Sequence, residues 1–255
     1  MASLILDNVH FSYPIFEVGA RSLKVSLFNQ VTGGRVASNA GHVRVDALQG
    51  ITARFGDGDR VALVGRNGSG KTTLLRLLAG LASPQKGSIA ATGRVVPLIT
   101  TGLGINPELS GEANIELPLR LLGANNAEVR HAMTEIPEFT GLGKFIKMPV
   151  RTYSEGMKAR LNFAIATSLH ADILILDEWL GAGDADFQDK AQKRLKEMVD
   201  RAGVLVITSH SMQLLRDVCN KAIWIDRGIQ VMTGEINPVI DSYLASSTLT
   251  SFAAE

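Results

Sequence analysis

The chain has 255 residues, of which 45% are hydrophobic and 20% charged, an ordinary globular composition with enough length for one domain and a subdomain. The formal net charge is +1 and the sequence has no long basic run, so it gives no support for general nucleic-acid binding. The single cysteine, Cys219, excludes an internal disulfide framework and lies in an apolar pattern that predicts a core residue.

The N-terminus and the apolar runs predict a peripheral rather than a membrane-spanning protein. Residues 1–10 lack the basic start and the long apolar stretch of a signal peptide. No segment approaches the roughly 20 apolar residues that a membrane helix needs. Any role at a membrane is therefore expected to be peripheral.

The first part of the chain predicts strands around an unusual insertion. Residues 3–11 predict a strand, and residues 12–45 contain a helical pattern followed by a glycine-rich stretch. The apolar face of that helical pattern, within residues 21–31, consists of Leu23, Leu27, Phe28 and Val31. From Leu48 two further strands follow, separated by a turn at residues 56–59.

A glycine-rich loop joins the second of these strands to a helix that is expected to end at Gly80. The loop fits the pattern G-x-x-x-x-G-K-[ST] in the strand–loop–helix context that the pattern demands. Its residues are Gly65, Arg66, Asn67, Gly68, Ser69, Gly70, Lys71 and Thr72. Glycines let main-chain N–H groups surround a β-phosphate, and the helix N-terminus adds partial positive charge. We expect Lys71 to reach the β- and γ-phosphates and Thr72 to complete a Mg²⁺ shell. A tight turn without function is the alternative interpretation.

The remaining segments alternate between strand and helix patterns, which favours an α/β fold with a mainly parallel sheet. Strands are predicted at 87–98, 173–177 and 204–209 and as a terminal hairpin at 221–234. The helical patterns comprise residues 105–150, interrupted by prolines at 107, 118, 137 and 149, a buried helix at 159–171, and an amphipathic helix with Phe187, Ala191, Leu195 and Val199 on its inner face.

Two carboxylates stand at the end of the buried strand at 173–177: Asp177 is its last residue and Glu178 follows it. Asp177 at the strand tip is expected to hold Mg²⁺ through water, and Glu178 points differently and is expected to polarise an attacking water. An acidic loop containing Asp184 comes next, and His210 follows the following strand, where α/β sheets place ligands. Solvated loop acids and a structural histidine are the alternatives.

Ser154 is a good N-cap for the buried helix, so the N–H groups behind it would form an anion site. In this arrangement the sequence resembles the ATP-binding-cassette (ABC) family over nearly the whole chain. GRNGSGKT is similar to the family's Walker A motif, YSEGM to its signature, ILILDE to its Walker B motif, GAGD to its D-loop and His210 to its switch histidine.

The resemblance implies a P-loop NTPase fold, with an N-terminal antiparallel β subdomain and an inserted α-helical subdomain, that binds ATP and Mg²⁺. It implies catalytic roles for Glu178, His210 and Lys71, and Mg²⁺ contacts for Thr72 and Asp177. It also implies a homodimer in which each signature caps the γ-phosphate held by the opposite Walker A motif. The remaining residues expected to contact the nucleotide are Thr73, Tyr13, Ser154, Glu155, Gly156, Met157 and Asp184. For Tyr13, expected to stack on adenine with Phe11 behind it, a core position is the alternative.

Two departures from the family pattern have consequences. Glu155 and Met157 replace the usual first glycine and the glutamine of the signature, so we expect Glu155 to face away from a phosphate or toward a basic neighbour. The Q-loop glutamine expected near residue 100 is missing. How the nucleotide site senses a membrane subunit is therefore open.

With these departures, the sequence resembles ABC cassettes that export bacterial polysaccharides such as O-antigen, capsule or teichoic acid. The resemblance implies an ATPase on the cytoplasmic face of the inner membrane, bound to a permease and not to nucleic acid. An importer or lipid exporter, or a soluble ABC ATPase, is the alternative. The expected organisation is a single nucleotide-binding domain. Its expected parts are a core with β subdomain at 1–104 and 163–235, a family-type insertion at 15–45, a helical subdomain at 105–162 and a C-terminal tail at 236–255.

Overall fold

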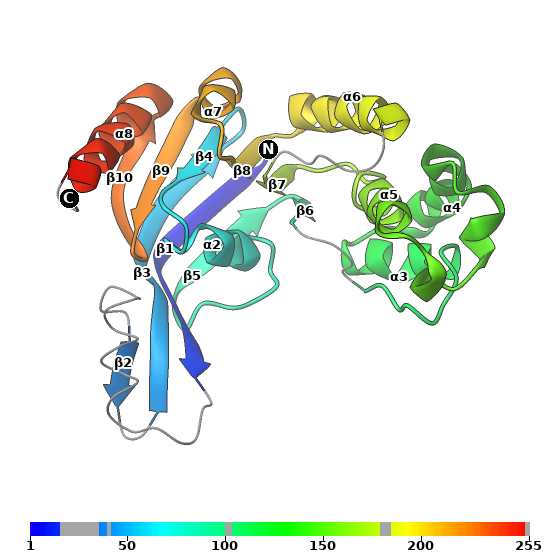
Figure 1. Ribbon diagram of the computed structural model, residues 1–255, viewed down its shortest axis with the longest axis horizontal. Helices are drawn as coiled ribbons and strands as arrows, with labels where there is room; N and C mark the ends of the chain where they lie inside the picture. The colour runs from blue at the N-terminus through cyan, green and yellow to red at the C-terminus, as the bar shows by residue number, and fades with distance from the viewer. Residues whose placement is uncertain (16–35, 40–41, 100–103, 179–184, 253–255) are drawn as a thin grey trace.

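The computed structural model describes residues 1–15, 36–39, 42–99, 104–178 and 185–252, which form two sheets with helices around them (Figure 1). The first sheet is four-stranded and antiparallel, in the order β2-β3-β1-β5. The second is six-stranded, in the order β10-β9-β4-β8-β7-β6, with every neighbouring pair parallel except β10 and β9. The α/β fold with a mainly parallel core sheet and an antiparallel N-terminal sheet is thus confirmed.

The antiparallel sheet extends further into the chain than the sequence analysis expected. Its strands are β1 (Ser3–Ile15), β2 (Val36–Asn39), β3 (His42–Gly56) and β5 (Lys86–Thr92). β1 continues past the predicted end because Tyr13, Pro14 and Ile15 pair with Val45, Arg44 and Val43 of β3. The predicted helix at 21–31 lies outside the described residues.

The core sheet is buried on both faces, one packed against the antiparallel sheet and one helix and the other packed against helices. Its strands are β4 (Arg60–Val64), β6 (Val95–Leu98), β7 (Ile173–Asp177), β8 (Val204–Thr208), β9 (Lys221–Asp226) and β10 (Ile229–Glu235). All five residues of β8 are buried, and so are the first four of β7. Such continuous apolar runs are what a parallel strand needs when both faces of its sheet are covered.

Three described helices each follow a core strand in the chain: one after β4, one after β7 and one after β8. They are α2 (Lys71–Leu78), α6 (Ala185–Arg201) and α7 (Met212–Val218). The inner face predicted for α6 is confirmed, because Phe187, Ala191, Leu195 and Val199 are all buried. Cys219, directly after α7, is buried as predicted.

The other helices between β6 and β7 form a group beside the core, which we call the helical lobe (Figure 1). Its members are α3 (Ala113–Leu121), α4 (Asn126–Thr140), the 3₁₀ turns η1 (Gly143–Lys147) and η2 (Val150–Thr152), and α5 (Glu155–Ala166). The expectation that prolines interrupt these helices is wrong for Pro118 and Pro137, which lie inside α3 and α4. Each proline removes one helical hydrogen bond. Burial of Ile115 and Leu119 in α3 and of Ile136 in α4 offsets that loss.

Most of the segment that the sequence analysis called a C-terminal tail is a helix. Helix α8 (Ile236–Phe252) packs against β9 and β10 and buries Ile236, Val239 and Ile240. Within the part of the chain that the structure describes, no helix combines the length and apolar character needed to cross a bilayer.

Candidate functional site

A cleft of about 810 Å³ opens at the carboxyl ends of β4, β7 and β8. It collects most of the residues that the sequence analysis selected. From that selection it is lined by Tyr13, Gly65, Arg66, Asn67, Gly68, Gly70, Lys71, Thr72, Thr73, Asp177, Glu178 and His210. Gly65, Asp177 and His210 lie far apart in the sequence and are brought together because parallel strands present their carboxyl ends at one edge of the sheet, whereas Tyr13 reaches the cleft from β1 of the antiparallel sheet.

Two glycines of the loop between β4 and α2 are required by close backbone contacts. A Cβ on Gly65 (φ 148°) would lie 2.1 Å from the carbonyl oxygen of Ile225, and one on Gly70 (φ 111°) would lie 2.6 Å from that of Ala47. Gly70 is also the N-cap of α2 and supplies no side-chain cap. The N–H groups at the start of α2 therefore have no side chain of the cap residue in front of them, which suits a phosphate ligand.

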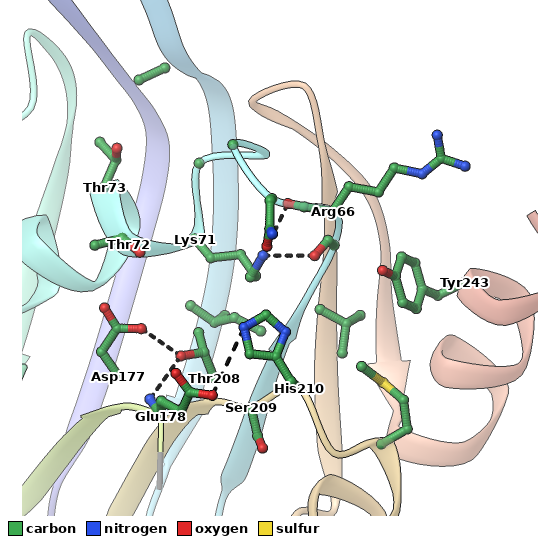
Figure 2. Close-up of a pocket in the computed structure, with 18 of the residues that line it drawn as sticks. Arg66, Lys71, Thr72, Thr73, Asp177, Glu178, Thr208, Ser209, His210 and Tyr243 are labelled. Atoms are coloured by element: carbon green, nitrogen blue, oxygen red, sulfur yellow. Dashed lines mark hydrogen bonds and ion pairs between the residues drawn. The ribbon is translucent and has the colours of Figure 1, made fainter. Parts of the chain in front are cut away.

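Lys71 reaches back over the loop. Its ammonium donates hydrogen bonds to the carbonyl oxygens of Gly65 at 2.7 Å and Arg66 at 3.0 Å (Figure 2). Partial burial lowers the pKa of Lys71, and the nearby carboxylate of Asp177 opposes that shift. The loop thus places a partly buried ammonium beside the position where a phosphate would bind.

The end of β7 and the end of β8 position the two carboxylates differently. The Thr208 hydroxyl donates a 2.7 Å hydrogen bond to Asp177 Oδ1, which ties that carboxylate to the neighbouring strand. Glu178 has a left-handed backbone (φ 69°), and its N–H donates to the carbonyl and hydroxyl oxygens of Thr208, each at 3.2 Å. Its Oε1 then lies 3.9 Å from His210 Nε2 (Figure 2). Glu178 and His210 thus lie side by side, with side chains 61% and 73% exposed.

The pocket has a donor set that fits Mg²⁺. The hydroxyl of Thr72 and the carboxylate of Asp177 both line it, next to the glycine cradle in which an added Cβ would collide with backbone. Mg²⁺ favours one or two protein oxygens and completes its shell with water and substrate phosphates. The described residues contain no cluster of three or more His, Cys, Asp or Glu side chains that could hold a metal without such help.

Tyr13 lies at the rim of the cleft and not in the core. Its side chain is exposed, its hydroxyl lies 3.4 Å from Thr73 Oγ1, and its ring packs edge-on against Phe11 with centroids 5.0 Å apart. Phe11 is partly buried against the core. The core alternative is thus excluded for Tyr13.

The signature residues Ser154, Glu155, Gly156 and Met157 do not line this pocket, because they lie at the start of α5 in the helical lobe. Ser154 is the N-cap of α5, and its hydroxyl accepts a hydrogen bond from the N–H of Met157 at 3.2 Å. The expectation for Glu155 is confirmed: its side chain is 89% exposed and pairs with Lys158 at 2.7 Å. Asp184 lies outside the described residues.

A profile of the ABC transporter family matches residues 48–181, more than half of the chain. The chain belongs to this family. It is an ATP-binding protein and an ATPase.

Characterised relatives cover almost the whole chain. It is 43% identical over 230 residues to the O-antigen export system ATP-binding protein RfbE of Yersinia enterocolitica, covering 90% of this chain and 96% of that protein. It is 36% identical to RfbB of Klebsiella pneumoniae, an O-antigen export system ATP-binding protein, covering 93% and 95% respectively. The teichoic acids export ATP-binding protein TagH of Bacillus cereus is 40% identical over 78% of this chain, which corresponds to 36% of TagH.

Solved structures confirm the ABC ATPase fold at low sequence identity. The ATP-binding cassette MJ0796, solved as a dimer in a post-hydrolysis state with ADP and Pi, superposes with a TM-score of 0.63 and 19% identity. That match covers 92% of this chain and 99% of MJ0796. An ATP-binding subunit of an ABC transporter gives a TM-score of 0.66 at 19% identity, covering 94% of this chain and 92% of that one.

Among the lining residues of this ABC ATPase that were not selected from the sequence, Thr208 and Tyr243 differ in the sequence signal that they carry. Thr208 carries a signal, because it is a polar residue at the end of a buried strand, directly before Ser209 and His210. Tyr243 carries none, because it comes from α8, 33 positions after His210, and only the packing of that helix brings it to the pocket. Long-range packing, rather than a motif, places it there.

Proposed function

We propose that this chain is the ATP-hydrolysing subunit of an exporter that moves a lipid-linked polysaccharide, such as O-antigen, across the bacterial inner membrane. The observation that carries the proposal is the identity of 43% with an O-antigen export ATP-binding protein, over 90% of this chain and 96% of that protein. The second relative, at 36% identity, has the same printed role. This agreement favours polysaccharide export over an importer, a lipid exporter or a soluble ABC ATPase.

In this proposal the chain acts at the cytoplasmic face of the inner membrane as a peripheral homodimer bound to an integral-membrane permease. The export systems named for the relatives and the dimeric cassette structures support this assembly. The single-chain geometry supports it as well, because Ser154 and the pocket lie in different parts of the chain. A second copy that presents its Ser154 would complete each pocket.

The pocket's own residues divide the work on ATP. When ATP binds, the Lys71 ammonium leaves its two carbonyl partners and binds the β- and γ-phosphates. The negative charge of the phosphates stabilises this desolvated cation more strongly than the two neutral carbonyl oxygens do. Residues 65–70 and the start of α2 surround the phosphates with N–H groups, and Tyr13 offers its ring to adenine. Thr72 and Asp177 would hold Mg²⁺, which supplies charge neutralisation at the phosphates when bound.

Glu178 and His210 act at the γ-phosphate end. The left-handed backbone of Glu178 turns its carboxylate away from Asp177 and toward His210, so the two neighbouring carboxylates serve different tasks. Glu178 accepts a proton from the attacking water, and His210 orients that water and the γ-phosphate. Ser154 of the partner copy, with the N–H groups behind it, closes over the same phosphate.

The Glu178→Gln variant tests the catalytic part and the dimer together. It should bind Mg-ATP, form a long-lived dimer in size-exclusion chromatography and lose about 10²–10⁴-fold in turnover, the range of general-base catalysis. The matched control is Glu116→Gln in α3, which changes an exposed carboxylate outside the pocket. Wild-type turnover in Glu178→Gln would remove Glu178 from the base role.

Cargo is tested in the producing cell. Deletion of this chain should leave lipid-linked polysaccharide inside the inner membrane and remove it from the surface, and the wild-type chain but not Glu178→Gln should restore it. Unchanged surface polysaccharide in the deletion strain contradicts polysaccharide export while leaving the ATPase intact.

A further inference from the structure

The C-terminal helix α8 forms part of the nucleotide pocket. Tyr243 of α8 lines the same cleft as Lys71 and His210, and its hydroxyl points into that cleft (Figure 2). The ring packs edge-on against Trp224 of β9 with centroids 5.9 Å apart. Ile236, Val239 and Ile240 anchor the same helix in the core. Helix α8 is therefore a fixed wall of the site.

Helix α7, in contrast, has few anchors of its own. It begins at Met212, two residues after His210, and only Leu215 among its seven residues is buried. Its N-cap is Ser211, whose side chain accepts from the N–H of Leu214 at 3.2 Å. A short helix with one fully buried side chain gains little from packing, so its position depends on contacts with neighbouring elements.

Arg216 supplies that contact. One arm of its guanidinium donates to Asn237 Oδ1 at 2.6 Å and the other to Asp241 Oδ1 at 2.5 Å. The two acceptors lie four residues apart, on one face of α8, so a single planar group binds α7 at two points. The Arg216 side chain is 25% exposed, whereas that of Asp241 is 68% exposed.

We propose that Arg216 is a positioning residue: by binding Asn237 and Asp241 of α8 it fixes α7, and thereby holds His210 beside Glu178. This inference rests on the proposed role of His210 in hydrolysis. An ion pair with one highly exposed partner adds little to global stability, so its removal should change catalysis without unfolding the protein. Arg216 touches neither the pocket lining nor Glu178 among the described contacts.

The labelling rate of the Cys219 thiol gives an independent measure of whether α7 keeps its position. Cys219 follows α7 directly, is buried, and its N–H donates to the carbonyl oxygen of Leu215. Burial raises the pKa of the Cys219 thiol to about 12, with Arg60 opposing the shift. The thiol is therefore protonated and covered at pH 8, and it reacts with a maleimide only when this region opens.

The experiment compares Arg216→Gln, Asp241→Asn and the double variant in the full chain at one fixed protein concentration. We expect kcat for ATP hydrolysis to fall about three- to tenfold in each single variant, with KM for ATP nearly unchanged and the double variant no slower than Arg216→Gln. The labelling rate of Cys219 should rise in the same variants. The matched control is Arg120→Gln, which breaks an exposed Arg–Glu pair within α3.

The outcomes separate this inference from the proposed function. Arg216→Gln with the kcat and the Cys219 labelling rate of Arg120→Gln overturns the positioning role. His210→Ala serves as reference: it should abolish most turnover, and adding Arg216→Gln to it should lower turnover no further. If His210→Ala keeps wild-type turnover, the proposed role of His210 fails, whatever Arg216→Gln does.

Discussion

The core sheet and the helical lobe are stabilised in different ways. The sheet is built from strands whose side chains are apolar and buried, with β7 and β8 covered along almost their full length. The lobe has its own apolar packing, but two arginine–glutamate pairs also tie it to the core. Arg94, just before β6, pairs with Glu128, and Arg194 of α6 pairs with Glu135. Both glutamates belong to α4.

This difference teaches where charge matters in the fold. Glu128 and Glu135 are seven residues apart and so lie on one face of α4, which points to the core. Arg194 also donates to the carbonyl oxygen of Thr167 at the end of α5 and lies 4.3 Å from the centre of the Phe139 ring. Helix α5, which Ser154 caps, is thus connected through Arg194 to α6, the first described helix after Glu178.

The largest effect is expected in the core sheet. Leu174 of β7 is completely buried, so Leu174→Ala should lower the free energy of unfolding by about 2–5 kcal/mol, through lost transfer energy and a cavity. Urea unfolding followed by circular dichroism measures the change. Leu117→Ala in the lobe is the control, because Leu117 is 53% exposed and its truncation should cost less than about 0.5 kcal/mol. Equal losses for the two leucines would contradict the comparison.

There is a physical reason why the sequence predicted the core sheet and selected residues that the structure brings together in one cleft. The phosphate loop, the carboxylates at the end of β7 and the histidine after β8 are each recognisable from a short stretch of sequence. A parallel sheet then necessarily brings the carboxyl ends of β4, β7 and β8 to one edge. The buried strands were visible as short apolar runs because both faces of the sheet are covered. Local chemistry and topology here agree.

Contacts between distant segments could not be predicted in the same way. Nothing near Tyr243 indicates a nucleotide pocket, and nothing near Pro118 indicates that α3 tolerates a proline. The pairing of Arg194 with Glu135 joins residues 59 positions apart on two helices. Such contacts depend on how helices pack, whereas periodicity only shows which face of a helix is apolar.

An intermediate effect on stability is expected for the ion pair between Arg194 and Glu135, which joins the lobe to the core. Arg194→Met leaves the carboxylate of Glu135, 27% exposed, without its cationic partner and removes the contact with the Phe139 ring. Because both side chains keep some solvent access, we expect a loss of about 2 kcal/mol in the free energy of unfolding, below the cost of breaking a fully buried pair. Urea unfolding measures it.

The companion variant separates charge from packing. Arg194→Met combined with Glu135→Leu should be more stable than Arg194→Met alone, since no uncompensated carboxylate remains. If the double variant is less stable by the sum of both single changes, the two side chains do not act as a pair and the lobe is held by apolar packing only.

The smallest effect on stability is expected for the ion pair between Arg94 and Glu128, and it should depend on pH. The Glu128 carboxylate accepts two hydrogen bonds from the Arg94 guanidinium, at 2.6 and 3.1 Å, and one from the N–H of Asn125. The hydrogen bonds from Arg94 and then the one from Asn125 lower the pKa of Glu128 in the folded state. A lowered pKa stabilises the fold at pH values above the pKa of Glu128 in the unfolded chain, and this contribution is lost as the pH falls through the pKa of the folded state.

Glu128→Gln should therefore lower the free energy of unfolding by about 1 kcal/mol at pH 7, because the carboxylate is 29% exposed, and by progressively less as the pH is lowered below about 4.3. Urea unfolding of wild type and variant at several pH values measures the difference, and a loss that stays constant down to pH values at which Glu128 is protonated would show that the amide disturbs packing rather than the ion pair.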